Sequence, residues 1–399
     1  MRILAASDIH LGRRPRHGNS GHDSWDLVVN KALELAVDVL VLAGDVIEHE
    51  RAWLSVYAPL VNGLRRLGEA NIRVIAVAGN HDWEVFSRLT AEAEQIKILG
   101  LGGTWESCDV EGVRFVGWSF ARSHHEQNPF TTFPGERDDC PLSLGLLHTD
   151  FGASPSRYAP TTAQDYDASG IGLWVLGHIH AGGPVADGRA FYCGSPYALD
   201  SGEGGPHGAW LIEDASPLTW KEPRFIPLSP VRYEEVAVTV TDLDEVEAIR
   251  SALRKSARAV ADDLDWAGEL YLTIRFVGSL AVGLSLSEVM GSPEEEVSFP
   301  AKDGITCYVQ RSFSDQTTPA IDLAQLESGS GADSQLARLL SDEQLLLSLY
   351  RRFEEESYNA SAYSTLIQSQ VDDEEAIDRA RRAGLRLLEA MVEQKRGGA

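Results

Sequence analysis

Five apolar runs in the first half of the chain stop on aspartate, asparagine or histidine. The endings read "SDIH", "AGD", "AGNHD", "LLH" and "GHIH", and they contain Asp8, His10, Asp45, Asn80, His148, His178 and His180. Asn and Asp are ordinary turn residues, and a lone histidine at a strand end is more often a hydrogen-bonding residue than a ligand. Turns alone do not predict the repetition, which favours a site for divalent cations.

The mixture of donors indicates which chemistry such a site would support. Seven oxygen and nitrogen donors exceed what one ion needs from the protein if open positions are to remain. Carboxylate and amide oxygens mixed with imidazole favour manganese, iron or zinc over a structural zinc held by thiolates. We therefore expect two divalent metal ions sharing one carboxylate, with Mn²⁺ as the first choice. Such a pair clamps the attacking and leaving oxygens of a phosphoryl group.

Alternating elements must position these donors. Strand patterns over residues 2–7, 38–43 and 73–78 alternate with helical patterns over residues 24–36 and 53–70, which predicts an α/β sheet. In such sheets ligands gather at the carboxyl ends of the strands, where the donors fall. Further strand runs follow over residues 113–120, 142–148, 173–180, 189–195 and 208–213, and we expect them to form a second sheet packed on the first.

The predicted fold is α/β: a two-sheet sandwich flanked by helices, with a small α/β capping domain and a C-terminal helical tail. We expect the catalytic domain over residues 1–228, the capping domain over 229–326 and the helical segment over 335–399. The stretch "ESGSGADS", residues 327–334, is typical of a flexible linker.

Charge and cysteine content limit the function classes. The 399 residues include 35 Lys and Arg against 60 Asp and Glu, a formal charge of −25, which argues against a polyanion binder held by bulk charge. Four scattered cysteines without a CxxC pair favour a reducing cytoplasm. Because no apolar run approaches the ~18 residues of a membrane span, we expect neither an export signal nor a membrane anchor.

Local basic residues leave a nucleic acid partner open. Arg13, Arg14 and Arg16 follow the first motif directly, on a loop at the predicted metal face. These arginines either lie on an ordinary solvated loop or contact DNA phosphates, and we favour the second interpretation.

The five blocks resemble the signature motifs of the calcineurin-like metallophosphoesterases. Within that superfamily the chain looks most like SbcD-type DNA repair exonuclease subunits, because "YAP" precedes the "GHIH" block and "FYCGSPYALD" follows it, with Cys193 where proline is usual. The resemblance implies that Asp8, His10 and His180 hold one metal, that Asn80, His148 and His178 hold the other, and that Asp45 bridges them. It also implies that His81 is the catalytic histidine, which protonates the leaving oxygen, and Asp82 is expected to orient its ring.

The resemblance implies a metal-dependent DNA exonuclease and endonuclease, the nuclease subunit of an SbcCD-like complex. Its partners would be DNA and a coiled-coil ATPase gripped by the C-terminal helices, with a homodimer possible and no membrane. A phosphodiesterase or phosphatase for small molecules or phosphoproteins is the alternative. A non-catalytic scaffold is disfavoured because all seven donors are present.

The C-terminal helical segment carries two apolar stripes. Both stripes fit helical spacing, and they comprise Leu346, Leu349, Tyr350 and Phe353, then Ile377, Ala380, Gly384, Leu387, Leu388 and Met391. The helices either pack on the cap or on each other, or they present an apolar face to the partner.

Overall fold

The structure is a computed structural model of the chain. It describes residues 1–17, 23–48, 53–89, 91, 94–135, 142–216, 219–291, 297–359 and 371–397. They fall into two compact units. The first comprises Met1–Glu234, Asp265–Tyr271 and Asp303–Thr306, and the second comprises Glu235–Leu264, Leu272–Lys302 and Cys307–Ala399.

The first sheet of the first unit is built on four parallel strands. Its order is β12-β11-β1-β2-β3-β4, with β13 also paired to β11, and β11 runs antiparallel to β1. The strands are β1 (Arg2–Ala6), β2 (Val39–Ala43), β3 (Arg73–Val77), β4 (Ile96–Ile98), β11 (Gly208–Ser216), β12 (Thr219–Trp220) and β13 (Arg224–Pro227).

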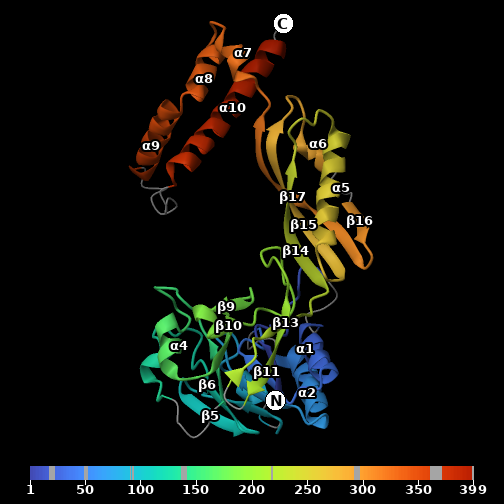
Figure 1. The fold of residues 1–399 in the computed structure, drawn as a ribbon, viewed down its shortest axis with the longest axis vertical. Coiled ribbons are helices and arrows are strands. Elements are labelled where there is room, and N and C mark those ends of the chain that lie inside the picture. Colours follow the sequence, from blue (N-terminus) through green and yellow to red (C-terminus); the bar gives the residue numbers. More distant parts are fainter. Residues whose placement is uncertain are drawn as a thin grey trace. The chain divides into compact units, whose positions relative to one another are not determined.

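The parallel strands are apolar on both faces because each face is covered. On one face, Leu4, Leu40 and Val74 pack with residues of α1 (Asp23–Glu34) and α2 (Trp53–Glu69). Helices α1 and α2 lie next to each other (Figure 1). On the other face, Ile3 and Val39 join a core shared with the second sheet. The period of two along each strand divides the side chains between these cores.

The second sheet has the order β5-β6-β7-β8-β10-β9, with β6, β7, β8 and β10 parallel. Its strands are β5 (Trp105–Val110), β6 (Val113–Trp118), β7 (Leu142–His148), β8 (Leu173–Gly177), β9 (Gly183–Val185) and β10 (Ala190–Tyr192). Helix α4 (Ala163–Ser169) contributes Tyr166 to the core on its outer face, where Trp174 is fully buried. The short elements α3 (Phe86–Leu89), η2 (Pro129–Thr132) and η3 (Ala186–Gly188) complete this unit. The predicted two-sheet sandwich flanked by helices is confirmed.

One strand lies in a different sheet from the one predicted. The run at residues 208–213 begins β11, which pairs antiparallel with β1 in the first sheet, with Arg2 opposite Glu213 and Ala5 opposite Trp210. An alternating apolar pattern marks a strand but carries no information on its neighbour, so the sequence alone could not assign it.

The second unit contains a sheet with the order β14-β15-β17-β16. Its strands are β14 (Val231–Thr239), which begins in the first unit, β15 (Gly268–Leu280), β16 (Val297–Lys302) and β17 (Ile305–Pro319), and its helices are α5 (Val246–Asp262) and α6 (Leu286–Met290). Helix α5 buries Ile249, Leu253, Ala257 and Ala261, which are four residues apart and form one helical face.

The C-terminal helices form their own small core. They are α7 (Leu323–Glu327), α8 (Ala332–Ser341), α9 (Glu343–Asn359) and α10 (Asp373–Gly397), and α9 and α10 lie side by side (Figure 1). Leu340, Leu346 and Leu388 are buried together in this core.

The predicted linker at residues 327–334 is corrected by the structure. Helix α8 begins at Ala332, and the Arg338 guanidinium donates to the carbonyl oxygens of Glu327 and Gly329. The connection is a short turn held by a side chain from the following helix, which its Gly and Ser content does not reveal. In the part of the chain that the structure describes, no helix is long and apolar enough to cross a membrane.

Candidate metal centre

All five predicted donor motifs stand at the carboxyl ends of strands. Asp8 follows β1, Asp45 follows β2 and Asn80 follows β3, while His148 is the last residue of β7 and His178 directly follows β8. Parallel strands in each sheet bring their carboxyl ends to one edge, so the two sheets together gather the donors.

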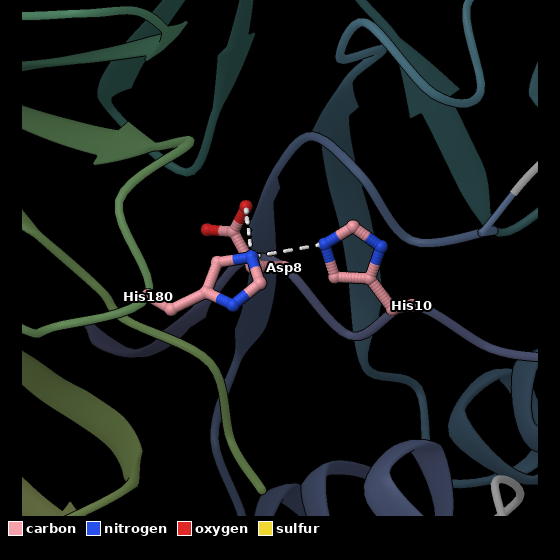
Figure 2. A group of neighbouring side chains, drawn as sticks. All are labelled: Asp8, His10 and His180. Carbon is pink, nitrogen blue, oxygen red and sulfur yellow. Dashed lines mark hydrogen bonds and ion pairs between the residues drawn. The ribbon is translucent and has the colours of Figure 1, made fainter. Parts of the chain in front are cut away.

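Asp8, His10 and His180 form one group of converging donors (Figure 2). The Nε2 atoms of His10 and His180 are 3.1 Å apart, and His180 Nε2 is 3.9 Å from a carboxylate oxygen of Asp8. One ligand atom from each of the three lies within 4.8 Å of the others.

A second group forms around His148, which is fully buried. Its Nε2 is 3.2 Å from a carboxylate oxygen of Asp45 and 3.1 Å from the amide oxygen of Asn80. Donors of Asp8, Asp45 and His148 lie within 4.8 Å of one another, and the His178 ring centroid is 5.3 Å from that of His148. The structure thus brings all seven predicted donors together.

Four of these residues have a backbone that non-glycine residues rarely adopt. The φ angles are 50° at Asp8, 48° at His10, 49° at Asp45 and 100° at His178. Strained φ values of this kind cost free energy and cluster at functional sites, where the surrounding structure imposes them. The clustering supports a functional site rather than a set of ordinary strand ends.

Two motif glycines are required by close approach. A Cβ at Gly79 would lie 2.1 Å from a carboxylate oxygen of Asp45, and a Cβ at Gly177 would lie 2.1 Å from the Ala43 carbonyl oxygen and 2.8 Å from His148 Nδ1. The glycines of "AGNHD" and "GHIH" therefore allow the loops to pack against the donors.

The buried donors attract positive charge. Burial acts to lower the pKa of His148, but the charge of Asp45 and the hydrogen bond to it raise that pKa to about 9. Burial likewise acts to raise the pKa of Asp45, and attraction to His148, His10 and His81 holds it below its usual range instead. A cation is thus favoured at this point.

Hydrogen bonds at Nδ1 prepare two histidines to bind a metal. His148 Nδ1 is 3.0 Å from the Ala43 carbonyl oxygen, and His180 Nδ1 is 2.6 Å from a carboxylate oxygen of Glu203. Because these oxygens only accept, each Nδ1 carries a hydrogen, and Nε2 is the nitrogen that each ring would offer to a metal ion once that atom has lost its proton. The donor set and its tautomers fit a divalent metal pair.

Asp82 does not have the predicted role of orienting His81. One of its carboxylate oxygens accepts from the backbone N–H of Gly79, and the other accepts from the N–H groups of Val46 and Ile47. Asp82 is fully buried, and burial together with the charge of Asp45 raises its pKa to about 7. It ties the loop after β3 to the loop after β2.

His81 is instead held by a backbone group. Its Nδ1 is 2.7 Å from the carbonyl oxygen of Glu48, and its backbone N–H donates to Asp45 at 2.9 Å. The residue is exposed, and its ring stands edge-on to His10 with centroids 5.1 Å apart. This places the imidazole beside the donor groups and open to solvent.

Sequence reasoning missed two carboxylates behind the donors. Glu203 accepts from His180 Nδ1 and, at 2.8 Å, from the backbone N–H of Leu199. Glu48 lies 2.7 Å from His10 Nδ1, an ion-pair distance without hydrogen-bond geometry. Glu48 stands three residues after Asp45 and could have been noticed there, whereas nothing in the sequence near Glu203 links it to His180.

The arginines predicted to contact DNA lie on the loop after His10. Arg13 pairs with Asp200 at 3.6 Å, Arg16 donates to Ser201 at 3.5 Å, and Arg14 is exposed. The partners of Arg13 and Arg16 belong to the segment just before Glu203, so this loop borders the candidate centre.

Part of the chain is similar to known proteins. Residues 1–182 match the family model described as "Calcineurin-like phosphoesterase". The "Uncharacterized metallophosphoesterase YhaO" of Bacillus subtilis is 27% identical over 231 residues, 56% of this chain and 56% of the relative. The "DNA double-strand break repair protein Mre11" of Haloferax volcanii is 27% identical over 271 residues, 64% of this chain and 58% of the relative.

A dimetal phosphatase structure from Danio rerio shares 15% identity with a TM-score of 0.37, covering 57% of this chain and 99% of that chain, a similarity too low to carry an argument. The chain spans a little over half the length of the two relatives above.

The two-sheet fold brings oxygen and imidazole donors together in groups that could each hold a divalent metal ion. Residues 1–182 are thus similar to calcineurin-like phosphoesterases, and the donor groups gathered there could hold divalent metal ions.

Proposed function

We propose that the protein is a two-metal phosphodiesterase that cleaves DNA as an exonuclease and endonuclease in DNA repair. The observation that carries the hydrolase part is the convergence of seven donors from two sheets beside one exposed histidine. The DNA part is supported by relatives named as Mre11 repair proteins and by the arginine loop beside the site.

In this proposal Asp8, His10 and His180 would hold one ion, Asn80, His148 and His178 would hold the other, and Asp45 would be shared by both. Bound cations, Mn²⁺ first among them, would supply positive charge at the phosphoryl oxygens and Lewis acidity toward water. The chain's own residues supply the rest.

His81 serves as general acid in the proposed mechanism. Since the Glu48 carbonyl oxygen only accepts, Nδ1 of His81 carries a hydrogen, which leaves Nε2 for the substrate. As a water molecule adds to phosphorus and gives up a proton to solvent, the P–O bond to the leaving group breaks, and Nε2 of the imidazolium form donates its proton to the leaving oxygen.

We also infer the roles of the remaining chain. Residues 1–228 would carry the chemistry, residues 229–326 would cap the DNA groove, and the helices of residues 335–399 would bind an SbcC-like coiled-coil ATPase. Exposed apolar side chains on α9 and α10 support the last role, because Phe353 is 65% and Leu387 57% exposed. A homodimer and a cytoplasmic location belong to the same proposal, the latter supported by Cys108, Cys193 and Cys307 being free thiols.

Hydrolysis of small phosphodiesters or of phosphoproteins is the second candidate. The formal charge of −25 favours it, because bulk charge repels a polyanion.

One experiment separates the two candidates. The protein is incubated with Mn²⁺ and, in parallel, with end-labelled linear DNA, single-stranded DNA, a chromogenic phosphodiester and a phosphopeptide, each with an EDTA control. We expect EDTA-sensitive cleavage of DNA. Hydrolysis of the chromogenic ester or phosphopeptide with intact DNA would support the second candidate instead.

A further inference from the structure

A cavity of about 460 Å³ opens beside the candidate metal centre. Asn80 and His81 line it, and both belong to the proposed site. The other lining residues are Trp83, Glu84, Ser123, His124 and Tyr158. Its volume falls in the range of pockets that hold small organic ligands, roughly 300 to 1,000 Å³. A group bound here would be a direct neighbour of the reacting phosphate.

Aromatic rings stand on the wall of this cavity. Tyr158 lies between the site and the cavity, with its ring centroid 4.6 Å from that of His178 and 5.7 Å from that of His124. Trp83 is half-buried and packs on the core behind the second sheet. A phosphate gains nothing from such rings, whereas a planar heterocycle stacks on them.

The charge of the lining also selects against a second phosphate. Among the described residues that line the cavity there is no lysine or arginine, and the Glu84 carboxylate pairs with Arg88 at 3.0 Å. A carboxylate paired in this way still accepts hydrogen bonds from the amino groups of bases. Ser123, whose Oγ lies 3.1 Å from His124 Nδ1, adds a hydroxyl.

We propose that this cavity binds the nucleobase next to the scissile phosphate, stacked against Trp83 and Tyr158. The inference rests on the proposed DNA cleavage and specifies it. A base can enter only after it leaves its neighbours in the duplex stack, so single strands and frayed ends would be preferred over internal duplex. Ser123 and His124, which line the cavity, would thus contact the base rather than the phosphate.

Single-stranded oligonucleotides with one residue replaced by a tetrahydrofuran unit, which lacks the base, test the proposal. Cleavage with Mn²⁺ is measured bond by bond on gels, with the abasic unit moved along the strand. Since stacking on an aromatic side chain favours binding by about 5- to 150-fold per base, we expect bonds beside the abasic unit to be cut slower by a factor in that range.

Protein variants assign the effect to the cavity. Trp83→Leu keeps an apolar side chain without the ring and should bring the ratio of normal to abasic cleavage toward one, while Trp83→Phe should keep most of the ratio. The matched control is Tyr57→Ala, because Tyr57 is an aromatic residue of α2 that is 42% exposed. This variant should keep the full ratio. Tyr158→Leu provides a second test if the melting temperature of Trp83→Leu shows that it does not fold.

The outcomes distinguish this inference from the proposed function. DNA cleavage that is indifferent to the abasic unit, or a ratio that survives both Trp83→Leu and Tyr158→Leu in folded protein, would overturn the base-binding cavity while leaving the nuclease intact. Intact DNA together with hydrolysis of the chromogenic ester would overturn the proposed function itself.

Discussion

Histidines of the candidate site lie in two different environments. His148 is fully buried between Asp45 and Asn80, whereas His81 is exposed and held through Nδ1 by the Glu48 carbonyl oxygen. The buried ring is placed to coordinate and the exposed ring is placed to reach a substrate.

His81→Ala should therefore retain the metals and lose hydrolysis. We expect a fall in the rate constant of about 10²- to 10⁴-fold, the usual contribution of a general acid. Metal content is measured by mass spectrometry on the same sample that is assayed. If metal and activity were lost together, His81 would be a metal ligand instead. Such a role is geometrically possible, because His81 forms a candidate donor group with His10 and Glu48.

Glu203 illustrates a positioning residue that acts through a proposed ligand. Burial acts to lower the pKa of His180, but the hydrogen bond from Nδ1 to Glu203 raises it, so the carboxylate favours a hydrogen at Nδ1. Glu203→Ala removes this partner and should weaken Mn²⁺ binding by about 10- to 100-fold. Titration calorimetry on the metal-free protein measures the affinity, and Glu203→Gln, which can still accept, should be intermediate. The surface variant Glu69→Ala is the control. If Glu203→Ala bound Mn²⁺ as tightly as this control does, Glu203 would not position His180 for metal binding.

At the scale of elements, the loops after β2 and β3 form one packed unit. Asp82 on the second loop accepts backbone hydrogens from Val46 and Ile47 on the first, and Gly79 leaves room for the Asp45 carboxylate. The position of Asp45 thus depends on a neighbouring loop as much as on its own strand.

Gly79→Ala should disrupt the centre without unfolding the sheet. The new Cβ would need the space 2.1 Å from the Asp45 oxygen, so the carboxylate must move. We expect Mn²⁺ affinity and hydrolysis to fall at least 10-fold, as for loss of a positioning contact. Gly68→Ala on α2, where a Cβ would meet Gln95 at an ordinary 3.4 Å, serves as the control and should bind metal normally. Normal metal binding by Gly79→Ala would show that the loops adapt.

At the scale of the whole molecule, a strongly acidic chain must bind DNA through local charge. Replacing Arg13, Arg14 and Arg16 together by Ala should weaken DNA binding and reduce its dependence on salt concentration. A chromogenic ester should be hydrolysed at nearly the original rate, because it contacts no distant phosphates. Binding is measured by fluorescence anisotropy over a salt series. Equal losses on both substrates would instead indicate that the substitutions damage the catalytic site. This control is needed because Arg13 also forms an ion pair with Asp200.

The C-terminal helices offer a second test at this scale. Part of each predicted stripe is buried inside the helical core, as Leu346 and Leu388 show, while Leu349, Phe353 and Leu387 are 38%, 65% and 57% exposed. Large exposed apolar side chains are common at protein interfaces. Changing these three exposed residues to Glu should leave folding and DNA cleavage intact but abolish co-purification with a coiled-coil ATPase.

These surface substitutions are a sharper test than removing residues 332–399, because Leu326 packs on the same core as Leu340 and would lose that core in a shortened chain. The triple substitution Leu336→Gln, Leu339→Gln and Leu385→Gln targets that core and should destabilise the protein, which distinguishes a packing defect from a lost interface. If the variant with Glu at positions 349, 353 and 387 still co-purified with the ATPase, α9 and α10 would not form the interface.

The sequence by itself determined the fold class and the positions of the seven donors. Alternating apolar residues specify strands locally, and parallel strands present their carboxyl ends at one edge, so Asp8, Asp45 and Asn80 had to lie near one another. These are consequences of short-range pattern and general topology.

Only the tertiary structure decided which groups support the donors. Glu203 meets His180 across 23 positions, Asp82 meets Val46 across 36, and the strand of residues 208–213 joins the first sheet through β1. Hydrogen-bond partners and strand neighbours are selected by packing among distant segments, because a buried polar group takes whichever partner the fold brings to it. No local pattern in the sequence carries that choice.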